Sequence, residues 1–167
     1  SNAVVSLKKT PAEITWKSGI DVLTFGGTKN GCLDAEAIIF FNSEDIKNFK
    51  YLQKRSGQLL SKMRFLSAQL DAYISNNLWY KNAKNSNSMA KILSTKLSRL
   101  NSIEITYPTE SNEVFVKIPK SIQDHLTKKG YYAVPDETFD GSVRFVSAWN
   151  TTEKDIDKLV NTIREKL

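Results

Sequence analysis

The strongest constraint on the fold is a change in the spacing of apolar residues near Leu100. Before Leu100, apolar residues recur at steps of three and four, which is the period of a helix with one buried face. After it, they alternate with polar residues, which is the period of a β-strand. A chain that changes from helical to strand spacing, and later back to helical spacing, predicts helices packed on a sheet in an α/β fold.

Two helices are predicted between residues 43 and 100. Ser43 can cap the first helix, and Asn76-Asn77 interrupts the pattern before the second. One stripe of the first helix carries Ile46, Phe49, Leu52, Leu59, Met63, Leu66, Leu70 and Tyr73. The second helix carries Trp79, Ala83, Met89, Leu93, Leu97 and Leu100, and these positions indicate core packing.

The remainder of the chain predicts a sheet with two further helices. Strands or extended segments are expected at 103–107, 114–118, 131–134 and 143–147, and a helix at 119–129 that stops at Gly130. The sequence Thr152-Glu153-Lys154-Asp155 is similar to a capping box and begins a last helix. From Ser43 onward the predicted order is helix, helix, strand, strand, helix, strand, strand, helix. This order predicts a small α/β sandwich, a sheet covered on one face by helices.

The first 42 residues have a different organisation. Thr10-Pro11-Ala12-Glu13 is typical of a short helix start, with Thr as the cap. Asp21–Phe25 predicts a short buried strand and Glu36–Phe41 a second strand, joined by a glycine-rich loop. These strands form either a hairpin or two edges of a larger sheet that would be short of partners within this chain.

Composition narrows the function classes. Of 167 residues, 24 are Lys or Arg and 18 are Asp or Glu, a net charge of +6, but the basic residues are spread along the chain. A solvated surface therefore explains the charge better than nucleic-acid binding, and a few cations could serve a small anionic cofactor or substrate. The single cysteine, Cys32, excludes an internal disulfide and a multi-cysteine zinc site. With no long apolar run, we expect a cytoplasmic location.

The most informative local motif is the loop Gly26-Gly27-Thr28-Lys29-Asn30-Gly31. It is not a P-loop, because Thr precedes Lys rather than following it. A lysine at the end of a strand, among small residues, can act as a nucleophile that forms a Schiff base with an aldehyde. The alternative is a turn lysine that points to water, and the spacing alone leaves both open.

A wider pattern surrounds this loop. The segment Asp21 to Gly31, with Ala35-Glu36-Ala37, resembles the pyridoxal-phosphate lysine segment of low-specificity L-threonine aldolases, which are fold-type I enzymes of the β-eliminating lyase superfamily. Further segments that resemble this family are Lys62 to Leu66, Ser111 to Phe115, and Val143 to Trp149 with Thr151 to Glu153. Asp34 departs from the family, where glycine is more frequent at this place.

The resemblance implies a role for four residues. Lys29 would be the catalytic lysine that bonds to pyridoxal 5'-phosphate, and no metal is implied. Thr28 and Arg64 would be further cofactor-binding residues, Arg64 by contacting the cofactor phosphate of a neighbouring subunit. Thr28 could instead only shape the turn, and Arg64 could belong to a solvated basic helix face. Arg144 would hold the carboxylate of an amino-acid substrate through two parallel hydrogen bonds, the alternative being a surface arginine. The implied reaction is retro-aldol cleavage of L-threonine or L-allo-threonine to glycine and acetaldehyde, in a homo-oligomer (dimer or tetramer).

The same resemblance implies a domain organisation. Family members are about twice as long, so residues 1–42 would be the tail end of the large transferase-like cofactor domain and 43–167 the C-terminal small domain. We expect this portion alone to be inactive, because the family's ring-stacking histidine, aspartate and phosphate loop are not found in it. Ser1-Asn2-Ala3 could be native or the remnant of a tag. The single histidine, His125, is not expected to stack on a cofactor ring.

Two alternative functions stay open at this stage. One is a pyridoxal-phosphate lyase of the same superfamily that acts on a larger β-hydroxy amino acid. The other is an inactive basic interaction module that kept the family's fold, which the net charge of +6 suggests.

Overall fold

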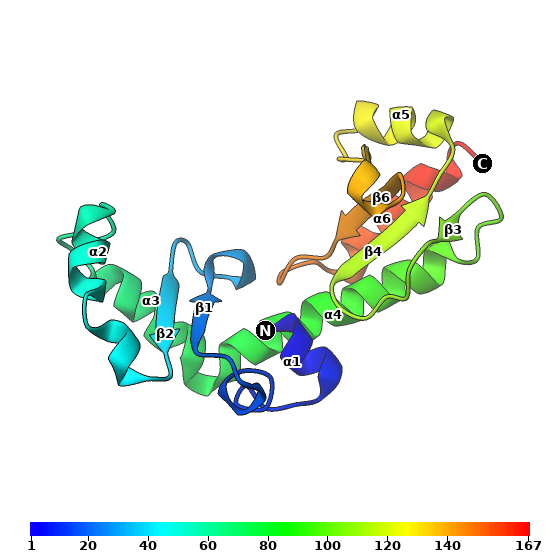
Figure 1. Ribbon diagram of the computed structural model, residues 1–167. Coiled ribbons are helices and arrows are strands. Elements are labelled where there is room, and N and C mark those ends of the chain that lie inside the picture. Colours follow the sequence, from blue (N-terminus) through cyan, green and yellow to red (C-terminus); the bar gives the residue numbers. More distant parts are fainter. The chain divides into compact units, whose positions relative to one another are not determined.

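The computed structural model describes the backbone of residues 1–167 and every side chain except those of Ser43 and Asp45. The cap predicted at Ser43 therefore lies outside the described side chains. The chain divides into two compact units, Ser1 with Ala3–Asn82 and Asn2 with Ala83–Leu167 (Figure 1). The domain boundary predicted at residue 42 concerns the complete protein and stays a prediction.

The first unit contains a two-stranded sheet and short helices. Its elements are α1 (Asn2–Leu7), 3₁₀ turn η1 (Trp16–Ser18), β1 (Val22–Gly26), η2 (Thr28–Asn30), β2 (Glu36–Phe40), η3 (Ser43–Ile46), α2 (Phe49–Arg55), α3 (Arg64–Ile74), η4 (Ser75–Asn77) and the beginning of α4 (Leu78–Leu97). Helix α1 was not predicted. At Thr10 the predicted cap does form, since its Oγ1 accepts from the Glu13 amide at 3.3 Å, but only turns follow it.

Strands β1 and β2 form a hairpin, one of the two arrangements that the sequence left open. They pair antiparallel, with Val22 opposite Phe40 and Gly26 opposite Glu36. The prediction that β1 is buried was wrong, because its residues alternate between exposed and half-buried. This sheet has only two strands. One of its faces packs against α3, where the centroid of the Phe25 ring lies 5.7 Å from that of the Tyr73 ring.

The first predicted long helix is in fact two helices, α2 and α3. Gly57 has a φ of 71°, a left-handed conformation that glycine adopts without steric cost. Its amide donates to the Lys54 carbonyl at 3.1 Å, and the Gln58 amide donates to the Gln53 carbonyl at 3.0 Å. These two bonds are the Schellman pattern that ends a helix. The predicted break at Asn76-Asn77 is confirmed, as both residues have a φ of 56°.

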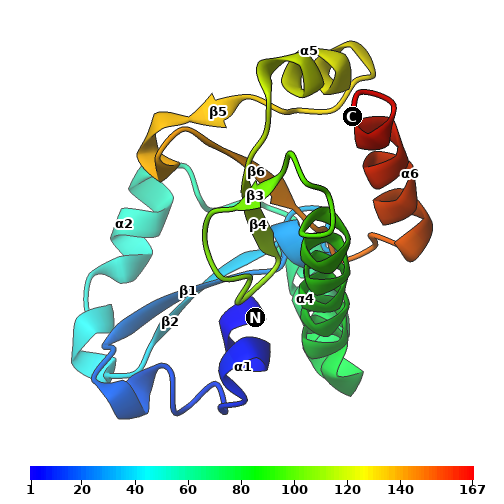
Figure 2. The ribbon, with the colours of Figure 1, turned by 90° about the vertical axis from the view of Figure 1, so that its right-hand side faces the viewer.

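The second unit has the sandwich architecture that was predicted, but it begins at Ala83, so the first predicted helix lies in the first unit. Its four-stranded antiparallel sheet has the order β3-β4-β6-β5, formed by β3 (Glu104–Ile105), β4 (Glu113–Lys117), β6 (Ser142–Val146) and β5 (Pro135–Asp136). Helices α4, α5 (Lys120–Lys128) and α6 (Glu153–Arg164) supply the other layer. Figure 2 shows α4 and α6 on one side of β4 and β6. The ladder of β5 begins at Pro135, directly after the segment 131–134 that was predicted to be extended.

One hydrophobic core lies between these layers. It takes Val114 and Val116 from β4, Val143 and Phe145 from β6, and residues of all three helices, among them Leu93, Leu97, Ile122, Leu126, Ile156, Leu159, Val160 and Ile163. The predicted buried positions of the last helix are therefore confirmed. Its capping box is confirmed as well, because Thr152 and Asp155 exchange side-chain to backbone hydrogen bonds.

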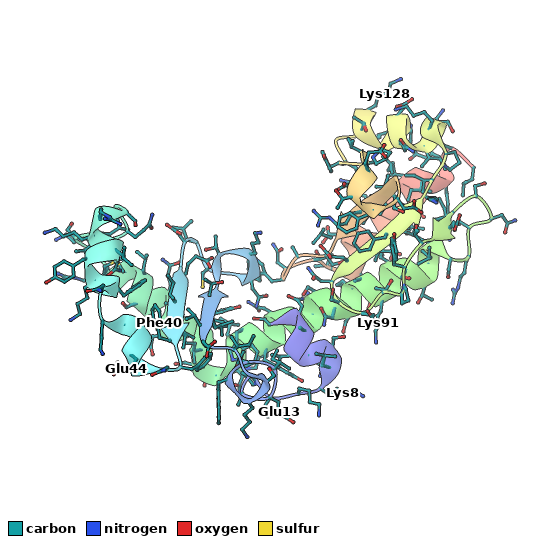
Figure 3. The ribbon with its side chains drawn as sticks, in the orientation of Figure 1. Lys8, Glu13, Phe40, Glu44, Lys91 and Lys128 are labelled. Atoms are coloured by element: carbon teal, nitrogen blue, oxygen red, sulfur yellow. The ribbon has the colours of Figure 1, made fainter. Side chains whose placement is uncertain are left out.

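The opposite face of this sheet is open. Phe115 on β4 packs against Tyr107 and Phe139, with ring centroids 5.5 and 4.7 Å apart. Arg144 on β6 lies on the same face, over the Phe139 ring. Exposed lysines occur elsewhere on separate helices, as Lys91 and Lys128 in Figure 3 show, which agrees with a solvated basic surface.

Candidate functional site

The loop that carries Lys29 is closed by backbone hydrogen bonds around Gly27. The Gly27 amide donates to the Ala35 carbonyl at 2.8 Å, and the Gly27 carbonyl accepts from the amides of Asn30 and Cys32 at 2.9 and 3.0 Å. Residues Thr28–Asn30 form a single 3₁₀ turn, which Gly31 ends with a φ of 114°. The backbone at Lys29 is therefore fixed from both sides.

Gly27 has no room for a side chain. A Cβ at this position would lie 2.5 Å from the Cys32 Sγ and 3.4 Å from the Tyr73 Cδ1. Cys32 is half-buried, and burial, followed by the charge of Glu36, raises the pKa of its thiol. Cys32 therefore packs directly against Gly27.

Lys29 itself is exposed. Within the described set of side chains it has no hydrogen bond or ion pair, so its amine is available to an incoming carbonyl compound. Thr28 is exposed too, and its Oγ1 accepts from the Ala35 amide at 3.2 Å. This bond shapes the turn, but it leaves the hydroxyl proton of Thr28 for another acceptor.

Arg64 belongs to the same unit as Thr28 and Lys29, and it is the first residue of α3. Its side chain is exposed, and no acidic residue occupies the first turn of the helix. A helix N-terminus carries partial positive charge. No side chain caps this N-terminus, so Arg64 and the end of the helix suit an anion such as a phosphate.

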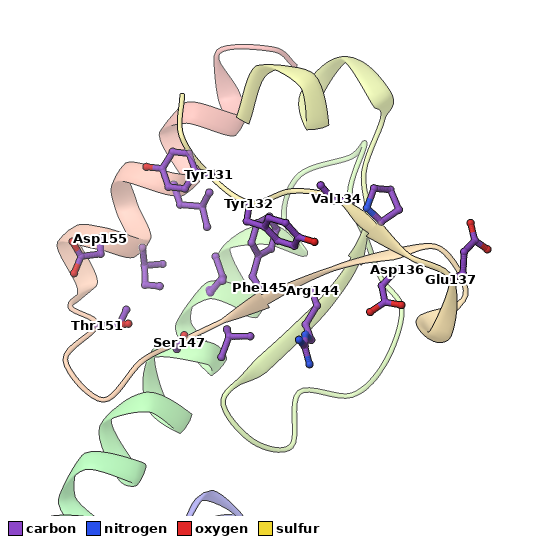
Figure 4. Close-up of a pocket in the computed structure, with 15 residues that line it drawn as sticks. Tyr131, Tyr132, Val134, Asp136, Glu137, Arg144, Phe145, Ser147, Thr151 and Asp155 are labelled. Atoms are coloured by element: carbon purple, nitrogen blue, oxygen red, sulfur yellow. The ribbon is translucent and has the colours of Figure 1, made fainter. Parts of the chain in front are cut away.

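Arg144 lies in the second unit, beside a cavity of about 730 Å³ (Figure 4). As predicted, it occupies the polar side of β6 between the buried residues Val143 and Phe145. Its Nη1 donates to the Glu113 Oε1 on β4 at 3.1 Å, and its guanidinium lies 5.7 Å from the centre of the Phe139 ring. The cavity is also lined by Tyr131, Tyr132, Asp136, Ser147 and Thr151.

Sequence reasoning missed the buried residues under the lysine loop. Asn30 is only 8% exposed and Tyr73 only 1%. Asn30 was interpreted as a polar loop residue and Tyr73 as a member of an apolar stripe. Nothing in the sequence indicated that the two side chains share a hydrogen bond, because 43 residues separate them.

Two features are absent from the residues that the structure describes. Among them no group of three or more His, Cys, Asp and Glu could hold a metal ion, and none of their helices is long and apolar enough to cross a membrane. His125 on α5 is paired with Glu165, with 2.9 Å between Nε2 and Oε2.

Comparisons with known proteins agree on one family. The family model described as Beta-eliminating lyase matches residues 1–121. The chain is 42% identical over 166 residues to a low specificity L-threonine aldolase of Pseudomonas sp. (strain NCIMB 10558). It is 37% identical over 166 residues to a protein of the same description from Pseudomonas aeruginosa. Each alignment covers 98% of this chain and 47% of the relative, so the chain spans about half the length of the curated relatives it matches.

Solved structures carry the same fold. A threonine aldolase from Leishmania major matches with a TM-score of 0.83 and 26% identity, over 98% of this chain and 48% of that one. A glycine decarboxylase (P-protein) of the glycine cleavage system, at 16% identity and a TM-score of 0.53, matches 87% of this chain and 35% of its own, and shows a likeness of fold alone. With its lysine loop, its mixed α/β fold and the family model matched over residues 1–121, the chain belongs to the beta-eliminating lyase family.

Proposed function

We propose that this chain is the C-terminal portion of a pyridoxal-phosphate-dependent L-threonine aldolase, an aldehyde-lyase. The complete protein would cleave L-threonine and L-allo-threonine to glycine and acetaldehyde. The observation that carries this proposal is the exposed amine of Lys29 on a rigid glycine turn. The identity of 42% to a low specificity L-threonine aldolase supports it.

The residues of the first unit fit pyridoxal 5'-phosphate. Lys29 would hold the cofactor through a covalent bond from its Nζ, because the amine is exposed and unpaired among the described side chains. Thr28 has a hydroxyl proton for a phosphate oxygen. Arg64 is exposed at a helix N-terminus and would contact the cofactor phosphate of a neighbouring subunit. When bound, the cofactor supplies the electron sink for breaking the Cα–Cβ bond of the amino acid.

Arg144 would bind the carboxylate of the substrate. Its bond to Glu113 uses Nη1 and leaves other N–H groups of the guanidinium free, and these can form two parallel bonds to a carboxylate. Glu113 and the Phe139 ring restrict the directions in which the guanidinium can point. Holding the carboxylate fixes which bond at Cα is aligned for cleavage, so Arg144 would orient the substrate rather than transfer a proton.

The remaining features of the proposal concern the complete protein. We propose a homo-oligomer, dimer or tetramer, in the cytoplasm; the single cysteine agrees with a reducing compartment. The comparisons favour the threonine aldolase over a lyase for a larger substrate and over a basic interaction module.

The test uses the complete natural chain that carries this sequence, supplied with pyridoxal phosphate. Borohydride reduction followed by peptide mass mapping should place the cofactor on Lys29. A Lys29→Arg variant should lose this label and the turnover of L-threonine, whereas Lys50→Arg, a change at another exposed lysine, should keep both. Full turnover by Lys29→Arg would overturn the proposal.

A substrate series separates the alternatives. L-Threonine, L-allo-threonine and phenylserine are each assayed for aldehyde release. Turnover of phenylserine alone would support a lyase for larger substrates, and no turnover of any of the three would reject the aldolase. The isolated 167-residue chain should be inactive in the same assay.

A further inference from the structure

Asn30 joins the lysine loop to the helices beneath it. It is the residue directly after Lys29, and its side chain is buried while that of Lys29 is exposed. The Asn30 Nδ2 donates to the hydroxyl of Tyr73 on α3 and to the backbone carbonyl of Trp79 on α4, the latter at 2.9 Å. The backbone carbonyl of Asn30 accepts from the Asn82 Nδ2 at 2.7 Å. All of these residues belong to the first unit.

The chemistry of asparagine matches these partners. An amide nitrogen has two N–H donors, and here the two acceptors are a phenol oxygen and a carbonyl oxygen. Tyr73 is 1% exposed, so loss of the Asn30 donors would remove a hydrogen-bond partner from its buried hydroxyl oxygen. A buried polar group without a partner is costly. The Tyr73 hydroxyl also lies 3.3 Å from the Ser1 Oγ, to which it can donate its own proton.

A second anchor holds the far side of the loop. The Gln69 Oε1 on α3 accepts from the amides of Leu33 and Asp34 at 2.9 and 3.2 Å. Asn30 and Gln69 thus attach both sides of the loop to the helices. Lys29 lies between these anchors, and its own side chain makes no hydrogen bond or ion pair among the described side chains.

We propose that Asn30, with Tyr73 as its buried partner, is a positioning residue that holds the backbone of Lys29 where its amine can bond the cofactor. This inference rests on the proposed function. Asn30 does not touch the cofactor in this proposal; it acts through the peptide unit that it shares with Lys29. A loop free to move would spread the amine over many positions, and the rate of bond formation would fall with the fraction in the productive one.

The test compares three variants of the complete natural chain: Asn30→Ala, Asn30→Asp and Tyr73→Phe. The matched controls are Asn150→Ala and Tyr51→Phe, which change exposed residues of the same types. The first readout is the rate at which visible absorbance of the lysine-bound cofactor develops, measured well below each melting midpoint. The second is amide hydrogen exchange of residues 27–33 without cofactor.

We expect both Asn30 variants to bond the cofactor about tenfold more slowly, since each loses both donors. In Tyr73→Phe the rate of cofactor bonding should fall only about threefold, because Asn30 keeps its hydrogen bond to the Trp79 carbonyl. Exchange of residues 27–33 should rise in the same order, and the controls should match the parent chain. A residue with a merely structural role would lower the melting midpoint and leave the rate of the folded variant unchanged.

Folded Asn30 variants that bond the cofactor at the parent rate would overturn the inference. If Asn30→Ala does not fold, the inference is tested with Asn30→Asp and Tyr73→Phe, by the same bonding rate and the same amide exchange. If the parent chain itself bonds no cofactor, the proposed function fails and the cofactor role of Asn30 fails with it. In that case the exchange rates still decide separately whether Asn30 anchors the loop.

Discussion

Arg144 on β6 and Glu113 on β4 form an ion pair with 3.1 Å between Nη1 and Oε1 on the open face of the sheet. Their side chains are 44% and 34% exposed, so the pair contributes little to stability, about 1 kcal/mol or less. Its consequence is orientation, because Nη1 of the guanidinium is held by Glu113. The remaining N–H groups would be the donors for the substrate carboxylate that we propose.

The first prediction concerns this arginine. Arg144→Lys keeps the charge but loses the planar pair of donors that binds a carboxylate. In the complete enzyme, KM for L-threonine should rise at least about tenfold. Steady-state kinetics measure the change, with Arg99→Lys, at another exposed arginine, as the control. An unaltered KM in Arg144→Lys would reject the carboxylate role.

The second prediction concerns the tight contact at Gly27. A Cβ on residue 27 would lie 2.5 Å from the Cys32 Sγ, so Gly27→Ala should destabilise the chain by about 1–3 kcal/mol. Cys32→Ala removes the sulfur and should restore part of this loss. Urea unfolding of both single variants and the double variant gives the coupling free energy. If the two free-energy changes simply add in the double variant, the Cys32 sulfur is not what excludes the methyl group that Gly27→Ala introduces.

The third prediction concerns the thiol of Cys32. Burial and the nearby Glu36 carboxylate raise its pKa, so less thiolate is present at neutral pH than in the unfolded chain. Alkylation by iodoacetamide should therefore be slower in the native chain than in urea, and should accelerate only at alkaline pH. Because the folded pKa is raised, the linked stability is present below the unfolded pKa and is lost as pH rises through the folded value. Equal native and unfolded rates at each pH would contradict this.

The fourth prediction concerns the capping box of α6. Hydrogen bonds from Thr152 lower the pKa of Asp155, so the folded state favours the carboxylate. The linked stability is present above the ordinary pKa of an aspartate and is lost as pH falls through the folded value. Thr152→Ala should cost about 1 kcal/mol at neutral pH and make the acid side of the stability curve flatter. Thermal melts from neutral to acidic pH measure both effects, with Thr151→Ala as a neighbouring comparison.

The second unit was predictable because local and long-range signals agree there. In β6 the alternation of Val143, Arg144 and Phe145 specifies both the strand and its buried face. In α6 the cap at Thr152 and the apolar stripe of Ile156 and Ile163 predict the same helix. Each signal depends on two local properties: the backbone conformation that a residue prefers, and the burial of one face of its strand or helix.

The failures have physical causes that spacing does not reveal. The apolar stripe continues through Leu59, but this side chain is 54% exposed, and the left-handed Gly57 has already ended α2. The left-handed conformation of Gly57 ends the helix although the apolar spacing continues past it. The buried pair of Asn30 and Tyr73 was not predictable, because it depends on how α3 lies under the loop.

The closed backbone ring around Gly27 separates the scaffold of this loop from its reactive group. The hydrogen bonds that shape the turn come from peptide groups and from Asn30 and Gln69, and none of them uses the side chain at position 29. The side chain at that position can therefore be replaced, by one with a thiol or a synthetic amine, while the backbone of the loop stays the same. The loop is thus a preformed scaffold on which protein engineers can present a chosen nucleophilic side chain.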